Sequence, residues 1–423
     1  MKLLPVDVER PLPGIDAPTL GEQWVLVRLH GDPLGMLKFP ASGCSTDELA
    51  DLIADRFSER ILRHLVGDRE LWGGAGQIES PCPRHTDFCR PKVTVAVCTR
   101  DGASRLPECL DSLVALQYTP GLLEILLIDN APTDDATKEL VETRYPSIRY
   151  VRESRPGLNW ARNRAVIEAS GELVAYTDDD VSVDAGWVEA VARIFAEEPE
   201  ADAVTGLVVP DEIDLEPQRL FEAYGGFSRG FDRRYYRINA LAGEKTAPRH
   251  GGTGKFGTGA NMAFRRSLFE RVGLFDPALD VGTPTNGGGD LDLFFRVLKA
   301  GRILVYEPAA IVRHRHRRTY EQLRTQLANN GIGFYAYLVR TAAVYPDERG
   351  AIVRLGLWWF AWWNLRRLAR SFLRPGELPR DLILAELFGC FTGVRRYARG
   401  KAAAEDVRRA FGPQTDHAAG TAP

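Results

Sequence analysis

Three consecutive carboxylates, Asp178, Asp179 and Asp180, follow a short apolar run at residues 173–177. A run of this length with β-branched and aromatic side chains is typical of a buried strand. Adjacent carboxylates repel one another, and a divalent cation that also holds a phosphate-bearing ligand would relieve that repulsion. Taken alone, the triplet fits a solvated acidic loop equally well. The rest of the chain must decide between a loop and a metal site.

Two further acids also follow predicted strands. Asp101 comes shortly after the strand at residues 93–97, and Asp129 comes directly after the strand at 124–128. Either acid alone is more typical of a helix N-cap or a turn. Helical segments are predicted at residues 105–116, 133–144 and 160–169, and another strand at 148–151. Strands that alternate with helices favour an α/β fold with a mostly parallel sheet, and ligands bind beyond the carboxyl ends of such strands. We therefore expect these acids to share one site.

Several motifs occur in order between residues 91 and 318. They begin with Val-Ala-Val-Cys-Thr-Arg-Asp at 95–101, Ile-Asp-Asn at 128–130, Gly-Leu-Asn-Trp-Ala-Arg-Asn at 157–163 and Thr-Asp-Asp-Asp at 177–180. Together they resemble family 2 glycosyltransferases of the GT-A fold, which are inverting enzymes that use nucleotide-sugar donors. The resemblance implies a Rossmann-like sheet flanked by helices and a DxD motif at the triplet. It implies nucleotide-sugar contacts for Thr99, Asp101, Asp129, Arg162, Asp178 and Asp179, and a metal contact for Asp180.

Two later motifs extend the resemblance to the sugar and the base. The glycine-rich segment at 257–266, which includes Asn261, is similar to the strand beneath the donor sugar. Gly-Gly-Gly-Asp at 287–290 resembles the Glu-Asp segment that opens the helix of the catalytic base, and this places the base at Asp290. The glutamate position is Gly289 here, which puts acceptor contacts in doubt. Asp292 is expected to be a solvated acid on the face of that helix.

Two histidines follow the last predicted strand of this region. His314 and His316 alternate on an extended segment, so both point to one side. Neutral imidazole is a good transition-metal ligand. The resemblance implies that a histidine here completes the metal site, with His314 preferred and His316 in reserve.

The remaining segments divide the chain into further units. We expect a small N-terminal α/β module with its linker at residues 1–90, the GT-A domain at 91–318, a helical region at 319–412 and a disordered tail at 413–423.

Cys82, His85 and Cys89 are closely spaced, but no second pair supports structural zinc. The tryptophan-rich run from Trp358 to Trp363 is too short to span a bilayer. The arginines that follow it favour a helix in the membrane interface, with a packed core helix or a dimer contact as the alternative.

Composition limits the class of partner and the compartment. A formal net charge of -3 and six cysteines in 423 residues argue against a nucleic-acid binder and against a disulfide framework, and favour the cytoplasm. The tryptophan-rich run adds the expectation of contact with the inner face of the plasma membrane. The sequence predicts an inverting transfer of sugar from a nucleoside-diphosphate sugar, with UDP as the expected nucleotide, to an acceptor hydroxyl, with Mn or Mg as cofactor. Such a reaction would serve cell-surface glycan, glycolipid or secondary-metabolite biosynthesis. A nucleotidyltransferase and a nucleotide-sugar-binding scaffold without turnover remain alternatives.

Overall fold

A small three-stranded sheet opens the chain in the computed structural model, which describes residues 2–16, 22–39, 43–71, 88–237, 253–373 and 378–414. Strand β2 (Gln23–Leu29) pairs in parallel with β1 (Leu4–Asp7) and antiparallel with β3 (Asp32–Phe39). Helix α1 (Thr46–Leu71) packs its apolar side, including Leu49, Ile53 and Phe57, against this sheet. These three strands and the helix make up the small α/β module that the sequence predicts at this end of the chain.

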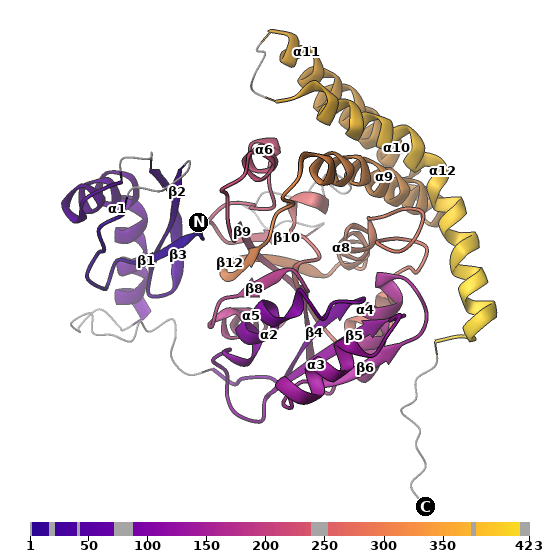
Figure 1. The fold of residues 1–423 in the computed structure, drawn as a ribbon, viewed down its shortest axis with the longest axis horizontal. Helices are drawn as coiled ribbons and strands as arrows, with labels where there is room; N and C mark the ends of the chain where they lie inside the picture. The colour runs from indigo at the N-terminus through magenta and orange to yellow at the C-terminus, as the bar shows by residue number, and fades with distance from the viewer. Residues whose placement is uncertain are drawn as a thin grey trace, which may run out of the picture.

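This N-terminal module is joined to the large domain by a shared apolar core (Figure 1). Trp24 and Leu26 of the module pack with Leu207 and Ile311 of the large sheet. At the rim, the Arg28 guanidinium lies 2.7 Å from the Asp184 carboxylate. Because apolar burial and an ion pair both cross the boundary, the module is fixed against the large domain.

The large sheet has nine strands in the order β10-β12-β9-β11-β7-β4-β5-β6, with β8 paired to β12. The β4–β7, β4–β5, β5–β6 and β9–β12 pairings are parallel, and the four that involve β8, β10 or β11 are antiparallel. The sheet is therefore mixed rather than mostly parallel. Its strands are β4 (Val93–Thr99), β5 (Leu123–Asn130), β6 (Arg149–Glu153), β7 (Leu173–Asp178), β8 (Val181–Val183), β9 (Ala201–Pro210), β10 (Arg234–Tyr236), β11 (Asn261–Arg265) and β12 (Ile303–His314).

Helices cover both faces of this sheet. One apolar layer contains side chains of α2, α3 and α5, and the other contains side chains of α4, α7 and α8. The central strands are buried throughout, as expected when both faces of a sheet are covered. The bounds are α2 (Leu106–Val114), α3 (Ala136–Arg144), α4 (Leu158–Glu168), α5 (Trp187–Glu197), α6 (Glu216–Tyr224), η2 (Thr253–Lys255), α7 (Leu268–Val272) and α8 (Gly289–Lys299).

The C-terminal region is helical and lies along one side of the large domain (Figure 1). Its longest helices, α9 (Tyr320–Val344) and α12 (Arg380–Phe411), pack against each other. Between them come η3 (Pro346–Glu348), α10 (Arg349–Trp358), the π-helical turn η4 (Trp359–Leu365) and α11 (Arg366–Leu373). No helix in the described part of the chain is long and apolar enough to cross a membrane.

A buried ion cluster ties α8 to these helices and corrects one expectation. Asp292 is fully buried, not solvated: its carboxylate lies 2.9 Å from Arg296 Nε and 2.6 Å from Arg340 Nη1 of α9. Tyr397 of α12 donates a hydrogen bond to Asp276, which also pairs with Arg340. The carboxylate of Asp292 therefore holds Arg296 of its own helix and Arg340 of α9, and the pair with Arg340 links the large domain to the C-terminal helices.

Asp292→Ala should destabilise the fold strongly. Removing one partner of a buried ion pair leaves the other charge uncompensated, which costs about 3–5 kcal/mol. Chemical denaturation should show this loss, and Asp406→Ala, in an exposed pair with Arg409, should change the free energy of unfolding by less than about 1 kcal/mol. Equal losses in the two variants would contradict the structural role of Asp292.

Candidate functional site

The carboxyl ends of three neighbouring parallel strands carry the predicted acids. In the sheet β4 lies between β7 and β5, so Thr99 is the Cα partner of Asp129 on one side, and Cys98 that of Asp178 on the other. The sequence predicted this common edge from strand periodicity alone. The structure brings Thr99, Asp129 and Asp178 together there.

Asp178, Asp180 and His314 form a group that could hold a metal ion. One ligand atom from each lies within 4.8 Å of the others, and His314 Nε2 is 3.3 Å from Asp180 Oδ1. Strand β8 pairs with the end of β12, so Val181 and His314 are Cα partners, which explains how a residue 134 positions away reaches the triplet. Two carboxylates and one imidazole suit Mn²⁺, and carboxylates with water suit Mg²⁺.

Burial shifts the pKa values of two of these side chains, His314 and Asp178. It lowers the pKa of His314 to about 4, so the imidazole is neutral at pH 7 and keeps a lone pair for a metal. Burial also raises the pKa of Asp178 to about 7, with Arg162 opposing the shift and the neighbouring acids adding to it. A bound cation would offset the cost of ionising Asp178, so the donor set fits a divalent metal.

Asp179 is held by side chains of the protein. Its carboxylate accepts a hydrogen bond of 2.5 Å from the Thr99 hydroxyl and lies 2.7 Å from Arg105 Nη2. Nothing in the sequence marks Arg105, which precedes α2, as a partner of Asp179. The contacts of Asp179 with Thr99 and Arg105 hold the turn after β7 in place. The direct nucleotide-sugar contact predicted for Asp179 remains a prediction.

Asp129 and Asp101 offer carboxylates farther along the same edge. Asp129 is fully buried; one oxygen accepts a bond from the Tyr150 hydroxyl, and Oδ1 has no hydrogen-bond partner among the described residues. Burial raises the pKa of Asp129. Asp101 is partly exposed at φ 49° and accepts hydrogen bonds from the Thr133 N–H and hydroxyl, which lower its pKa. The orphaned oxygen of Asp129 is suited to accept a hydrogen bond from a ligand.

Arg162 is buried rather than solvated, and it pairs with an acid that the sequence did not reveal. Its Nη1 lies 2.6 Å from the carboxylate of Asp280, and both residues are more than nine-tenths buried. Burial acts to lower the pKa of this guanidinium, but the charges of Asp280, Asp178 and Asp290 together raise it. The guanidinium of Arg162 is thus influenced by the carboxylates of Asp280, Asp178 and Asp290.

Asp290 lies in the first turn of α8, facing the glycine-rich segment before β11. Its Oδ2 accepts a 2.9 Å hydrogen bond from the Gly259 N–H, and its Oδ1 accepts one from the N–H of Leu291. Burial and the charge of Asp280 raise its pKa, while Arg162 and the two backbone donors act against the shift. A carboxylate with a raised pKa is a better proton acceptor than a free one, which suits a general base.

Two predicted site residues, Asn261 and His316, have their side chains bonded to other parts of the protein. Asn261 is buried, and its amide is fully used: Nδ2 donates to the carbonyls of Leu207 and Ala310, while Oδ1 accepts from Trp187 Nε1. Its role here is to join three strands and α5, so we do not carry it into the proposed ligand contacts. His316 Nε2 lies 2.7 Å from Glu222, outside the metal group.

Cys82 and His85 lie outside the described residues, while Cys89 is exposed and has a free thiol.

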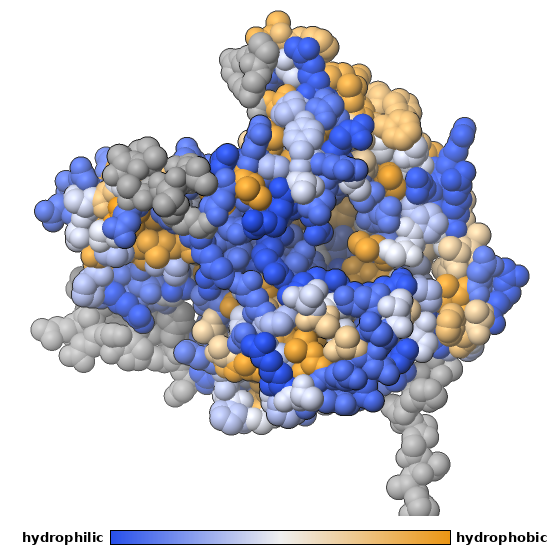
Figure 2. Space-filling view, viewed as in Figure 1, coloured by the Kyte–Doolittle hydropathy of each residue, from blue (hydrophilic) through white to orange (hydrophobic). Residues whose placement is uncertain are grey.

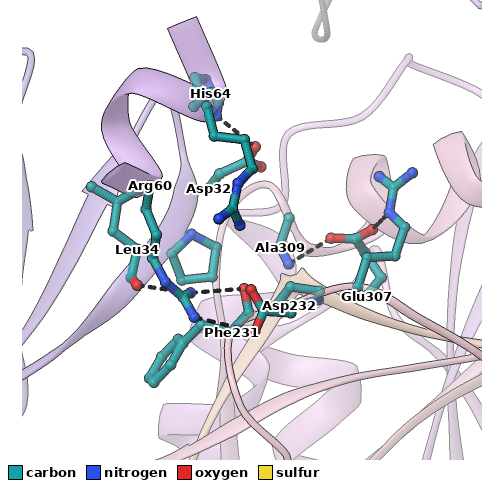
Figure 3. A pocket seen from close by; sticks show the side chains of 12 residues that line it. Asp32, Leu34, Arg60, His64, Phe231, Asp232, Glu307 and Ala309 are labelled. Atoms are coloured by element: carbon teal, nitrogen blue, oxygen red, sulfur yellow. Dashed lines mark hydrogen bonds and ion pairs between the residues drawn. The ribbon is translucent and has the colours of Figure 1, made fainter. Parts of the chain in front are cut away.

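A cavity of about 330 Å³ lies elsewhere, between the N-terminal module and the large sheet (Figure 3). Most of its charged side chains pair with one another: Arg60 lies 3.1 Å from Asp232, His64 lies 3.3 Å from Asp32, and Glu307 pairs with Arg233. It contains none of the strand-end acids. We therefore place the functional site at the edge of the sheet, where carboxylates remain available to a ligand.

The comparisons with known proteins agree with this geometry. The model of "Glycosyl transferase family 2" matches residues 94–273, which include the acids at all three strand ends. Residues 94–273 are a family 2 glycosyltransferase domain.

Relatives of this glycosyltransferase domain differ in their named substrates. The chain is 28% identical over 328 residues to a pre-mycofactocin glycosyltransferase of Mycobacterium tuberculosis, covering 76% of this chain and 60% of that protein. It is 25% identical over 191 residues to a glucosyl-dolichyl phosphate glucuronosyltransferase of Haloferax volcanii, covering 44% of this chain and 56% of the relative. The chain thus spans less than two thirds of the length of these relatives.

A solved structure is also similar: a mannosyltransferase of Pyrobaculum calidifontis in complex with GDP-Man and Mn²⁺, with 19% identity, a TM-score of 0.42 and coverage of 87% of this chain and 88% of that one.

Proposed function

We propose that this protein is an inverting glycosyltransferase that moves a sugar from a nucleoside-diphosphate sugar to an acceptor hydroxyl. The observation that carries this is the presence of two groups: a metal-binding set at Asp178, Asp180 and His314, and a half-buried, hydrogen-bonded carboxylate at Asp290. Both occur in a chain whose residues 94–273 match family 2.

Each group has a separate task in this reaction. Asp290 accepts the proton of the acceptor hydroxyl as that oxygen attacks the anomeric carbon, and attack from the face opposite the leaving group inverts the centre. Asp178, Asp180 and His314 would hold a divalent cation, which supplies positive charge for the leaving diphosphate. Asp129 and Asp101 accept hydrogen bonds from the base or ribose.

A nucleotide-sugar screen tests this proposal without knowledge of the acceptor. A thermal-shift series with UDP-, GDP- and dTDP-sugars, each with Mn²⁺ or Mg²⁺, should raise the melting temperature for one donor only when metal is present; we propose UDP as the nucleotide. That donor, incubated with acceptor-containing extract, should then yield the nucleoside diphosphate. Release of pyrophosphate would indicate the nucleotidyltransferase instead, and binding without turnover would indicate the scaffold.

The C-terminal helices carry an apolar face that we propose rests on a membrane surface. Leu357, Trp362, Phe388 and Phe391, from α10, η4 and α12, are each more than half exposed. Hydrophobic patches gather over these helices in the upper part of Figure 2. Residues 349–373 contain five arginines and no acidic residue, so the same surface would attract anionic lipid. A two-fold contact between copies would bring these like charges together.

Leu357→Ser combined with Trp362→Ser should weaken binding to phosphatidylglycerol vesicles at least about tenfold, because each buried apolar side chain contributes about 1.5–3 kcal/mol. Vesicle sedimentation measures this, and Leu62→Ser, which removes an equally exposed leucine from α1, should leave binding unchanged. Undiminished vesicle binding in the double variant, or a shift from dimer to monomer in gel filtration, would refute the proposal. Attachment of this kind places the enzyme at the inner face of the plasma membrane, beside a glycan or glycolipid acceptor.

A further inference from the structure

The glycine at position 289 is required by its surroundings. A Cβ atom at this position would lie 2.4 Å from Asn159 Nδ2 and 2.5 Å from Asp280 Oδ2, closer than real Cβ contacts. The resemblance to family 2 places a glutamate here. The space that its side chain would fill is taken by the carboxylate of Asp280, which arrives from the loop between α7 and α8.

Asp280 adopts a backbone conformation that an L-residue seldom holds. Its φ is +80°, where glycine is favoured and aspartate is tolerated at some cost. Its N–H donates to the carbonyl of Gly287, and its side chain is more than nine-tenths buried. Such a conformation persists where the surroundings fix it, often at functional sites.

The Asp280 carboxylate reaches the predicted base through two intermediate residues, Arg162 and Gly259. It holds the Arg162 guanidinium at 2.6 Å. Arg162 in turn lies directly against Gly259, since a Cβ at Gly259 would lie 2.6 Å from Arg162 Nη2. The N–H of Gly259 then donates to Asp290. A displacement of Arg162 would therefore move the backbone donor that orients Asp290.

We infer that Asp280 replaces the carboxylate missing at position 289 and acts as a positioning residue, holding Arg162 so that Gly259 orients Asp290. The occupation of the space beside Gly289 by Asp280 follows from the packing, and the glutamate that it replaces is the one that the resemblance to family 2 implies. The positioning role rests on the proposed glycosyl transfer.

A double-mutant cycle tests the replacement without any substrate. Gly289→Ala should lower the melting temperature of the wild type, and this loss should be at most about half as large in an Asp280→Gly background. Glycine accepts φ +80° without strain, so the second background keeps the loop conformation. The clash of the new Cβ atom with Asn159 is present in both backgrounds, so it largely cancels when the two losses of melting temperature are subtracted. An equal loss of melting temperature in both backgrounds would overturn the replacement.

Kinetics with the donor found in the nucleotide-sugar screen test the positioning role. Asp280→Asn keeps the side-chain shape but removes the charge that holds Arg162. It should lower kcat about 10- to 100-fold, the cost of a small misplacement of a reacting group, with the donor KM within about threefold. Asp276→Asn is the matched control, because Asp276 lies in the same loop but pairs with Arg340, 3.4 Å away. It should leave kcat within about threefold.

Equal loss of kcat in the two variants, or a raised donor KM with kcat retained, would overturn the positioning role. If the wild type turns over no donor at all, the proposed function fails, and the thermal cycle still decides whether Asp280 occupies the space of the missing side chain.

Discussion

Asp290→Asn should lower the rate of sugar transfer by about 100- to 10,000-fold, the contribution expected of a positioned general base. Asparagine retains an oxygen that can accept the Gly259 hydrogen bond but cannot take a proton from an acceptor hydroxyl. Donor binding should persist, because Asp290 lies outside the metal group. Steady-state transfer assays and donor titration by thermal shift measure the two effects separately.

The stability of this variant separates a catalytic loss from misfolding. The pKa of Asp290 is raised in the folded protein, so the ionised form is disfavoured there, and at neutral pH the carboxylate costs folding free energy relative to the unfolded chain. Asparagine removes that cost. The melting temperature at pH 7 should therefore be unchanged or higher, and Asp111→Asn, an exposed acid of α2, should keep full activity. Retained turnover in Asp290→Asn would refute the assignment of the base.

The pH profile follows from the same shift. Only the ionised carboxylate can accept a proton, so kcat should fall as the pH drops through the raised pKa of Asp290. Asp280 contributes to raising that pKa, whereas Arg162 lowers it. Asp280→Asn should accordingly move the acidic limb of the profile to lower pH. A limb that stays in place would mean that another group controls it.

Strand-end acids could be predicted from the sequence because their position depends on local periodicity. Alternating strands and helices place Asp129 and Asp178 at one edge, and the pairing of β4 with both neighbours agrees. The hydrogen bond from the Gly259 N–H to Asp290 was not predicted, because the resemblance placed the glycine-rich segment only beneath the donor sugar. Arg105 could not be found this way, since its partner Asp179 is 74 positions away and nothing local marks either as a pair.

Other features depend on the path of the chain between elements. Strand β11 enters antiparallel between β7 and β9, so Asn261 meets three strands and cannot be judged from its motif. Asp292 looked like a solvated acid on an amphipathic helix, but α9 covers that face and supplies Arg340. The exposed phenylalanines of α12 join the tryptophans of η4 in one surface only because the helices fold back on each other, as the packing of Phe360 against Phe391 shows.

Removing the metal, or one of its ligands, should abolish transfer. Chelation with EDTA should reduce the rate to background and Mn²⁺ should restore it, because the diphosphate would otherwise leave without a counter-charge in a site rich in carboxylates. His314→Ala and Asp180→Ala should each weaken Mn²⁺ binding, measured by isothermal titration calorimetry, by at least about 10- to 100-fold. Calorimetry reports this loss whether or not the donor is known.

His316→Ala is the matched control for these ligand variants. His316 is two residues from His314, and the Nδ1 atoms of the two rings are 3.4 Å apart, yet its Nε2 faces Glu222 rather than Asp180. If His314 is the ligand, His316→Ala should keep Mn²⁺ affinity within about threefold, and only His314→Ala should lose it. The reverse order would transfer the ligand role to His316. Equal affinity in all variants would leave the carboxylates at the end of β7 without a metal, and the acidic turn would then be held by Arg105, Arg317 and Thr99 alone.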